Sequence, residues 1–344
     1  MSRHQPRDAA RAPLTLALAG DVMLGRLVND RLRTRGATHV WDPRLLQAMR
    51  RADLRLVNLE CALTASSERW HDGGEKIFSF RADPGPAIEA LELAGIDFAS
   101  NANNHACDYG PRGLIDTVEA LDRAGIAHAG AGADLDRARA PAMLEAAGQR
   151  VVVSAWADYP MQWGATDRDP GINYTEVSTA LDDFTVVADA LREARALGDL
   201  VIFCIHWGPN MRERPTALFR EFAHAVIDAG ADVFWGHSAH VMHGIEFSNG
   251  RPILYDTGDF VDDYMVDPRL RNDLSALFLL RAVAGVVSEV EVLPTRIEDA
   301  RARLATGADR RRVVQRMTSL CRELGTVVEE RSGRIVVVPD RPGA

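Results

Sequence analysis

Three histidines follow two short apolar runs in the second half of the chain. His206 comes directly after residues 200–205, and His237 and His240 follow residues 231–236. The end of a buried strand is where α/β sheets build their sites, and a neutral imidazole is a common metal ligand. A single loop histidine is usually only hydrogen-bonded, but three at successive strand ends favour a metal site.

Carboxylates and amides follow the earlier apolar runs in the same way. Asp21, Glu60 and the run Asn103-Asn104-His105 each come after a short apolar stretch. Alone, an aspartate in this position is often a helix N-cap. Together with the histidines, these groups form a ligand set that suits Mn²⁺, Fe²⁺ or Zn²⁺, and a carboxylate shared by two ions can hold them about 3.5–4 Å apart. The sequence therefore predicts a hydrolytic centre with two divalent transition metal ions.

The elements that would position these residues alternate along the chain, which is typical of α/β proteins. Short apolar runs predict strands at residues 14–19, 54–58, 98–100, 127–129, 151–155, 200–205, 233–235 and 253–256. Segments with helical periodicity predict helices at residues 43–51, 86–94, 111–124, 177–196 and 218–229.

The pattern changes after residue 273. We expect two strands at residues 274–283 and 286–294, a charged helical stretch at 296–324 that is interrupted around Gly307, and a closing hairpin at 326–339. We therefore divide the chain into a disordered tail (residues 1–12), a catalytic domain (13–295) and a C-terminal helical and hairpin extension (296–344).

Composition limits the partners and the compartment. The net charge of −9 argues against a nucleic-acid surface, because phosphate binding needs a basic footprint. The four cysteines show no CxxC spacing, which indicates thiols in a reducing compartment rather than a zinc ribbon or a disulfide framework. No apolar run is long enough for a transmembrane segment. We expect a cytoplasmic protein that does not bind nucleic acid; its oligomeric state stays open.

Five motifs occur in a fixed order between residues 14 and 264: Gly-Asp, Asn-Leu-Glu, Asn-Asn-His-x-x-Asp-Tyr-Gly, His-Trp-Gly and Gly-His-x-x-His. This set resembles the CapA-type poly-γ-glutamate (capsule) synthesis proteins, a branch of the calcineurin-like metallophosphoesterase superfamily. The resemblance implies an α/β fold, a two-sheet α/β/β/α sandwich with a dimetal site at the strand ends. The section after residue 295 would be a small α+β extension.

The resemblance also implies roles for individual residues. One metal would be held by Asp21 and His240, the other by Asn104, His206 and His237, with Glu60 as the bridge. His105 would protonate the leaving group, and Asp108 would orient it.

The chain departs from the superfamily pattern in three places and from many CapA-type chains in a fourth. The second motif is Asn-Leu-Glu in place of Gly-Asp-x-x-Asp. Position 23 is methionine where ordinary superfamily phosphatases have the histidine of Asp-x-His, and two residues rather than one separate His237 from His240. The Ser-Leu-Gly-Asn-Phe of many CapA-type chains corresponds to residues 255–260, which adds Asp259. That carboxylate could be a further ligand, a proton acceptor or a turn former.

The favoured function is a metal-dependent hydrolase that activates water on a phosphoester or amide of an anionic, small-molecule or peptide-like substrate. Lys76, Arg212 and Arg214 are expected to bind the substrate's anionic groups, although each could instead be a solvated loop residue. Two alternatives stay open: a peptide-modifying enzyme that abstracts a proton in the manner of an epimerase, and a non-catalytic, metal-stabilised component of a polymer biosynthesis or export assembly.

Overall fold

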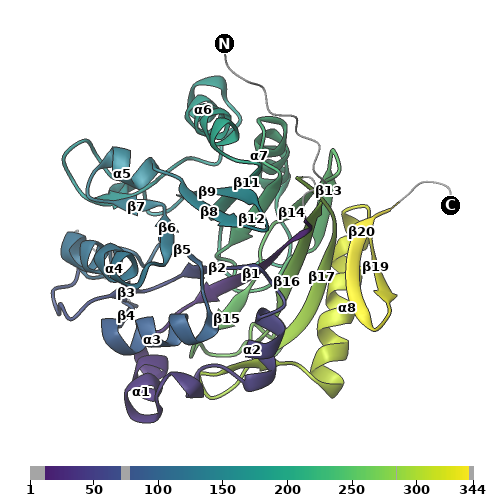
Figure 1. Cartoon of the computed structure of the whole chain (residues 1–344), viewed down its shortest axis with the longest axis horizontal. Coiled ribbons are helices and arrows are strands. Elements are labelled where there is room, and N and C mark those ends of the chain that lie inside the picture. Colours follow the sequence, from purple (N-terminus) through teal and green to yellow (C-terminus); the bar gives the residue numbers. More distant parts are fainter. Residues whose placement is uncertain (1–11, 71–77, 284, 341–344) are drawn as a thin grey trace.

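Two packed sheets with helices on both outer faces form the body of the protein (Figure 1). The computed structural model describes residues 12–70, 78–283 and 285–340. The α/β/β/α sandwich expected from the resemblance is confirmed. The predicted disordered tail, residues 1–12, lies outside the described residues except for Ala12, whose carbonyl accepts a hydrogen bond from Gln149.

The first sheet holds the N-terminal strands and the C-terminal hairpin. Within the described chain it has ten strands, in the order β19 (Thr326–Arg331), β20 (Arg334–Pro339), β17 (Val286–Ile297), β16 (Leu274–Val283), β1 (Leu14–Val22), β2 (Leu54–Leu59), β5 (Phe98–Ser100) and β6 (Ala127–Ala129), with β15 (Asp259–Val261) beside β1 and β18 (Ala302–Leu304) beside β17. Strands β1, β2, β5 and β6 run parallel, so their carboxyl ends lie at one edge.

The second sheet comes from the middle of the chain. Its strands are β13 (Ile245–Ser248), β14 (Arg251–Leu254), β12 (Val233–His237), β11 (Leu200–His206), β9 (Gln149–Ala157) and β8 (Ala142–Ala146). Strands β9, β11, β12 and β14 are parallel. Two small ribbons lie outside the main sheets: β3 (Ala62–Leu63) with β4 (Arg81–Ala82), and β7 (Ala131–Gly132) with β10 (Gly171–Ile172).

Alternation along β1 shows why the strands are buried on both faces. Leu14, Leu16 and Leu18 lie in the core between the two sheets, whereas Ala17 and Ala19 face the helices on the outer side. Successive strand residues point to opposite faces, so a continuous apolar run is what a doubly covered strand requires.

Helices cover both outer faces. The helices of the described chain are α1 (Arg26–Arg35), α2 (Pro43–Met49), α3 (Pro84–Ala94), α4 (Gly110–Ala124), α5 (Leu135–Arg139), α6 (Leu181–Leu197), α7 (Ala217–Asp228) and α8 (Gly307–Glu323). Helices α1, α2 and α3 bury apolar side chains against the first sheet, and α6 and α7 against the second. The Asp42 carboxylate caps α2 by accepting from the amide of Arg44, and Pro43 occupies its first turn.

The strands and helices predicted before residue 296 are all present, with ends that differ by a few residues. Helix α1 was not predicted. Its residues are mostly charged, with only Val28 and Leu32 buried, so the apolar periodicity that identifies an amphipathic helix is weak there.

The C-terminal section requires one correction. A charged helical stretch interrupted around Gly307 was expected over residues 296–324. The part after the interruption is α8, which begins at Gly307, but the part before it is not helical, because β17 continues to Ile297 and residues 302–304 form β18. Arg296 and Arg303 pair across these strands. Arginine-rich edge strands carry little apolar alternation, which is why the sequence suggested a helix. The hairpin at residues 326–339 is confirmed as β19 and β20.

Helix α8 and the hairpin join both sheets. Val313, Met317 and Cys321 belong to the core between the sheets, and the amide of Ile245 in β13 donates to the Cys321 sulfur at 3.3 Å. Strand β20 pairs with β17, and the predicted boundary at residue 295 falls inside β17. The division of the chain into domains stays a prediction. In the described residues, no helix is both long and apolar enough to cross a bilayer.

The burial of α8 leads to a stability prediction. Met317→Ala should lower the free energy of unfolding by about 2–5 kcal/mol, because it leaves a cavity between α8 and the sheets. Urea denaturation followed by circular dichroism measures this loss. Gln315→Ala, at an exposed position of the same helix, should change stability by less than about 0.5 kcal/mol. Similar small effects for both variants would show that α8 is not part of the core.

Candidate metal centre

Two glycines allow the backbone to close around the centre. A Cβ at Gly20 would lie 1.6 Å from the carbonyl oxygen of Gly258, and a Cβ at Gly236 would lie 2.2 Å from that of Tyr255. Only glycine permits such approaches. They place the next residues, Asp21 and His237, against segment 255–259 from another part of the chain.

Six buried side chains converge at the carboxyl ends of the strands. The first sheet supplies the carboxylates, Asp21 from β1, Glu60 after β2 and Asp259 from β15; the second supplies the imidazoles, His206 from β11, His237 from β12 and His240 from the loop after it. Each is at most 8% exposed. The structure therefore brings together five of the six predicted metal ligands and adds Asp259.

The ligand atoms form two groups that share Asp21. In the first group, Nδ1 of His206 and Nδ1 of His237 are 2.9 Å apart and lie 3.8 and 3.7 Å from Oδ1 of Asp21. In the second, Nδ1 of His240 lies 2.8 Å from Oδ1 of Asp259 and 3.6 Å from Oδ2 of Asp21. The candidate ligand atoms of each group all lie within 4.8 Å of one another.

The buried carboxylates have oxygens that lack protein donors. Oδ2 of Asp21, Oε1 of Glu60 and Oδ2 of Asp259 accept no hydrogen bond from the described residues. Burial, followed by repulsion from Glu60, raises the pKa of Asp21 well above its usual value, and burial also raises the pKa of Glu60. Buried carboxylates of this kind need a cation or a proton, so the residues present fit divalent metal ions.

The histidines respond differently to burial. Burial lowers the pKa of His237 to about 3, which keeps its imidazole neutral and able to act as a ligand. Burial also acts to lower the pKa of His240, but the carboxylates of Asp259 and Glu60 outweigh it and raise that pKa well above its usual value. The carboxylates around the His240 ring therefore stabilise its protonated form.

Met23 stands at the position of the superfamily histidine but does not act as a ligand in its place. Its sulfur accepts a hydrogen bond from the amide of Gly25 at 3.1 Å, and its side chain packs in the core on the helical side of the first sheet. Asp259 is the additional carboxylate beside His240. The sequence signal for it was its place after Gly258 in the altered motif of residues 255–260.

Two asparagines orient the shared carboxylate. The Asn58 amide donates to Oδ1 of Asp21 at 2.7 Å, and the Asn103 amide donates to Asn58 at 3.1 Å and to the carbonyl of Leu59 at 2.9 Å. Asn58 and Asn103 stand in the predicted motifs, but neither was assigned a role. Asn104, a predicted ligand, is half-buried in the same loop, between Asn103 and His105, and its role as a ligand stays a prediction.

His105 lies beside the ligands, as predicted. Its Nδ1 is 2.6 Å from Oδ2 of Asp108, so this nitrogen donates to the carboxylate, and its Nε2 faces Oε1 of Glu60 at 3.9 Å. Phe80 stacks on the ring at 4.1 Å between centroids, and its amide donates to the same Asp108 oxygen at 2.6 Å. These contacts fix the plane and tautomer of the imidazole.

A cavity of about 420 Å³ lies against His105 and His240 and is also lined by Arg26, Phe78, Phe80 and Tyr264. The Tyr264 hydroxyl donates to Oε2 of Glu60 at 2.9 Å. The Arg26 guanidinium lies 5.5 Å from the centre of the Phe80 ring and 3.2 Å from Asp263. Sequence reasoning missed both residues, because neither stands in one of the five motifs, although Arg26 follows Asp21 and Tyr264 follows Asp259 closely along the chain.

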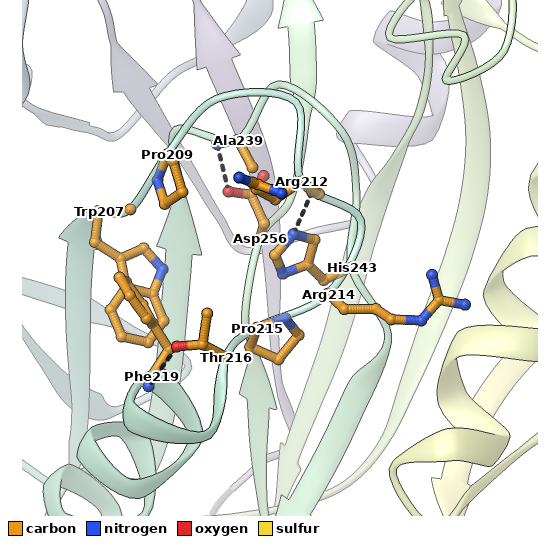
Figure 2. Close-up of a pocket in the computed structure, with 11 residues that line it drawn as sticks. Trp207, Pro209, Arg212, Arg214, Pro215, Thr216, Phe219, Ala239, His243 and Asp256 are labelled. Carbon is orange, nitrogen blue, oxygen red and sulfur yellow. Dashed lines mark hydrogen bonds between the residues drawn. The ribbon is translucent and has the colours of Figure 1, made fainter.

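Arg212 and Arg214, which were predicted to bind the substrate, line a second cavity of about 320 Å³ beside the loops that carry the histidines (Figure 2). Figure 2 shows the Arg214 side chain directed away from this cavity, and its guanidinium forms two hydrogen bonds of 2.7 Å with Glu323 of α8. The Arg212 carbonyl accepts from Nε2 of His243 at 2.7 Å. Neither arginine lines the cavity at His105. Lys76 lies outside the described residues.

Known proteins share most of the chain. A family model described as bacterial capsule synthesis protein PGA_cap matches residues 15–264. A probable polyglutamine synthesis accessory protein of Mycobacterium tuberculosis is 34% identical over 298 residues, which are 83% of this chain and 77% of that protein. The capsule biosynthesis protein CapA of Bacillus anthracis is 26% identical over 307 residues, 89% and 73% of the two chains. The PGA biosynthesis protein CapA of Bacillus subtilis is 27% identical over 289 residues, 83% and 72%.

The buried His243 leads to a pH prediction. Burial lowers its pKa from 6.5 to about 4, so its stabilising contribution is complete above pH 6.5 and is lost as the pH falls toward 4. When the pH falls from 7 to 4, the free energy of unfolding of His243→Gln should therefore fall by about 3 kcal/mol less than that of the parent protein. Urea unfolding at a series of pH values measures the difference. Parallel curves for the two proteins would contradict the assignment.

Proposed function

The chain belongs to the bacterial capsule synthesis protein family, and from that premise we propose that it is a metal-dependent hydrolase. The family expected from the five motifs is thus confirmed. The observation that carries the proposal is the pair of ligand groups that share Asp21 beside a cavity lined by His105.

Two divalent transition metal ions, Mn²⁺, Fe²⁺ or Zn²⁺, fit this ligand set. We assign Asp21, His206 and His237 to one ion and Asp21, His240 and Asp259 to the other. When bound, such ions would activate water and polarise the bond to be cleaved. We also assign Glu60 as a ligand, because its Oε1 lies 3.8 Å from Nε2 of His206.

His105 is the group that moves a proton to the leaving atom. Its Nδ1 is held by Asp108, so Nε2 is the nitrogen that faces Glu60 and the centre. Stacking on Phe80 keeps the ring in one orientation, as a group that transfers a proton requires. Asp108 acts through His105 and is a positioning residue.

The substrate we propose is an anionic, peptide-like molecule with an amide or phosphoester bond, handled during polymer synthesis. The names of these relatives refer to capsule, PGA and polyglutamine synthesis. Arg26 supports the assignment, because its guanidinium lines the cavity at His105 and can bind an oxyanion. We place this reaction in the cytoplasm, in keeping with four cysteines that form no disulfide within the described chain.

A second candidate function is that of a metal-stabilised, non-catalytic component of a polymer-synthesis assembly. The word "accessory" in the name of the mycobacterial relative favours it. Turnover separates the two functions. A protein that holds its metals but hydrolyses neither an activated phosphodiester nor a γ-glutamyl peptide would support the assembly role.

Metal content tests the shared ligand. Asp21→Asn should lose most of both metals, because both groups depend on this carboxylate, whereas Asp259→Asn should keep about one ion per chain. Mass spectrometry of dialysed protein measures the metal-to-protein ratio. Asp189→Asn, on the exposed face of α6, is the matched control and should retain the parent's content. A normal ratio in Asp21→Asn would rule out the assignment.

Leaving-group dependence tests the role of His105. His105→Asn should keep the metals and lower turnover about 10²–10⁴-fold on a substrate with a poor leaving group. The loss should be smaller for a nitrophenyl ester, since an acidic leaving group needs no proton to depart. Steady-state rates on the two substrates supply the comparison. Equal losses on both, or disappearance of one metal, would exclude the acid role.

A further inference from the structure

A cleft of about 390 Å³ lies on the C-terminal side of the molecule, apart from the metal centre. Its walls come from α2 and the residues after it, from β17, β20 and the start of α8. None of its lining residues is a proposed ligand or lines the cavity at His105. The cleft is lined by four arginines and one acid: Arg44, Arg51, Arg310, Arg334 and Glu291. We call this cleft the arginine cleft.

Two of the arginines are already paired with acids. Arg51 forms hydrogen bonds of 2.9 and 2.6 Å with the buried carboxylate of Glu291. Arg334 lies 3.1 Å from Glu289 and 3.6 Å from Glu291. Glu291 is therefore shared between two guanidinium groups and has little capacity to neutralise the others.

Arg44 and Arg310 remain without acidic partners. Within the described chain, neither guanidinium group forms an ion pair or a hydrogen bond. The two arginines are unpaired even though acidic residues outnumber basic ones in the whole protein, which has a net charge of −9. Positive charges gathered on one cleft of an acidic protein repel one another unless an anion lies between them. This arrangement is typical of sites for carboxylate and phosphate groups, which guanidinium forks bind in bidentate fashion.

The start of α8 adds to the positive potential. Thr306 and Gly307 line the cleft, and the Thr306 side chain makes no capping hydrogen bond. The first turn of this 17-residue helix therefore has no side-chain acceptor at its N-cap, and its acidic residue, Asp309, is already paired with Arg296 and Arg271. Helix amides and two unpaired guanidinium groups together favour an anion with more than one negative group.

We propose that the arginine cleft binds a multivalent oxyanion, a ligand with two or more carboxylate or phosphate groups, at Arg44 and Arg310. The cleft is separate from the hydrolytic centre, so the proposal does not rest on the function proposed above. Binding there would hold an anionic chain or headgroup on the protein without contact to the metal ligands.

Calorimetric titration of the full-length, metal-loaded protein tests the cleft with two probes, pyrophosphate and a short oligomer of glutamate. Arg44→Gln/Arg310→Gln should weaken binding of the preferred probe about 100-fold, about ten-fold for each arginine. Each single variant supplies an independent readout. The control Arg137→Gln/Arg168→Gln makes the same charge change at exposed positions in α5 and in the loop before β10, and it should bind as the parent does. Figure 1 shows α5 on the opposite side of the molecule from α8 and β20.

The two probes distinguish the source of the oxyanion. Tighter binding of the glutamate oligomer identifies a polycarboxylate ligand, and tighter binding of pyrophosphate identifies a phosphate ligand; either result supports the cleft. No saturable binding by the parent protein, unchanged binding in the cleft variants, or equal weakening in the control variant would overturn the proposal. Metal content and turnover should stay at the parent's values in all of these variants, so this outcome is independent of the hydrolase assignment.

Discussion

The burial of negative charge at Asp21 is the constraint on which the rest of the centre depends. A carboxylate taken out of water is strongly destabilising unless positive charge or hydrogen-bond donors surround it. The Asn58 amide satisfies one oxygen of Asp21, and the imidazoles of the second sheet surround the rest. The same need extends to Glu60 and Asp259, so the centre combines carboxylates from one sheet with imidazoles from the other.

Close backbone contact makes this combination possible. Gly20 approaches Gly258 and Gly236 approaches Tyr255, so ligands from distant parts of the sequence meet within a few ångströms. Ser238 and His240 have φ angles of +122° and +60°, values that side chains rarely adopt and that functional loops tolerate. Asp256 stabilises this loop by accepting from the amides of Ala239 and Gly258. The position of the His240 imidazole is thus set by a tightly connected backbone.

Much of the centre could be predicted because each ligand sits at the end of an apolar run, a signal local to the sequence. Asp21, His206 and His237 were found in this way. Tyr264 and Arg26 were missed because each lies just beyond a ligand along the chain, where no local pattern shows that the side chain turns back toward the centre. The strand at residues 302–304 was missed for a related reason. Its pairing partner is β17, and an arginine-rich edge strand shows no apolar alternation.

The division of ligands between the sheets has a thermodynamic consequence. His206, His237 and His240 share no strand with Asp21, Glu60 and Asp259, so a complete ligand set exists only while the two sheets are docked. The binding energy of the proposed ions would therefore also stabilise the packing of the two sheets against each other. By mass action, free ion at a thousand times its dissociation constant adds about 4 kcal/mol to native stability. The amount of folded protein in a cell would then follow the supply of ion, whether or not substrate is present.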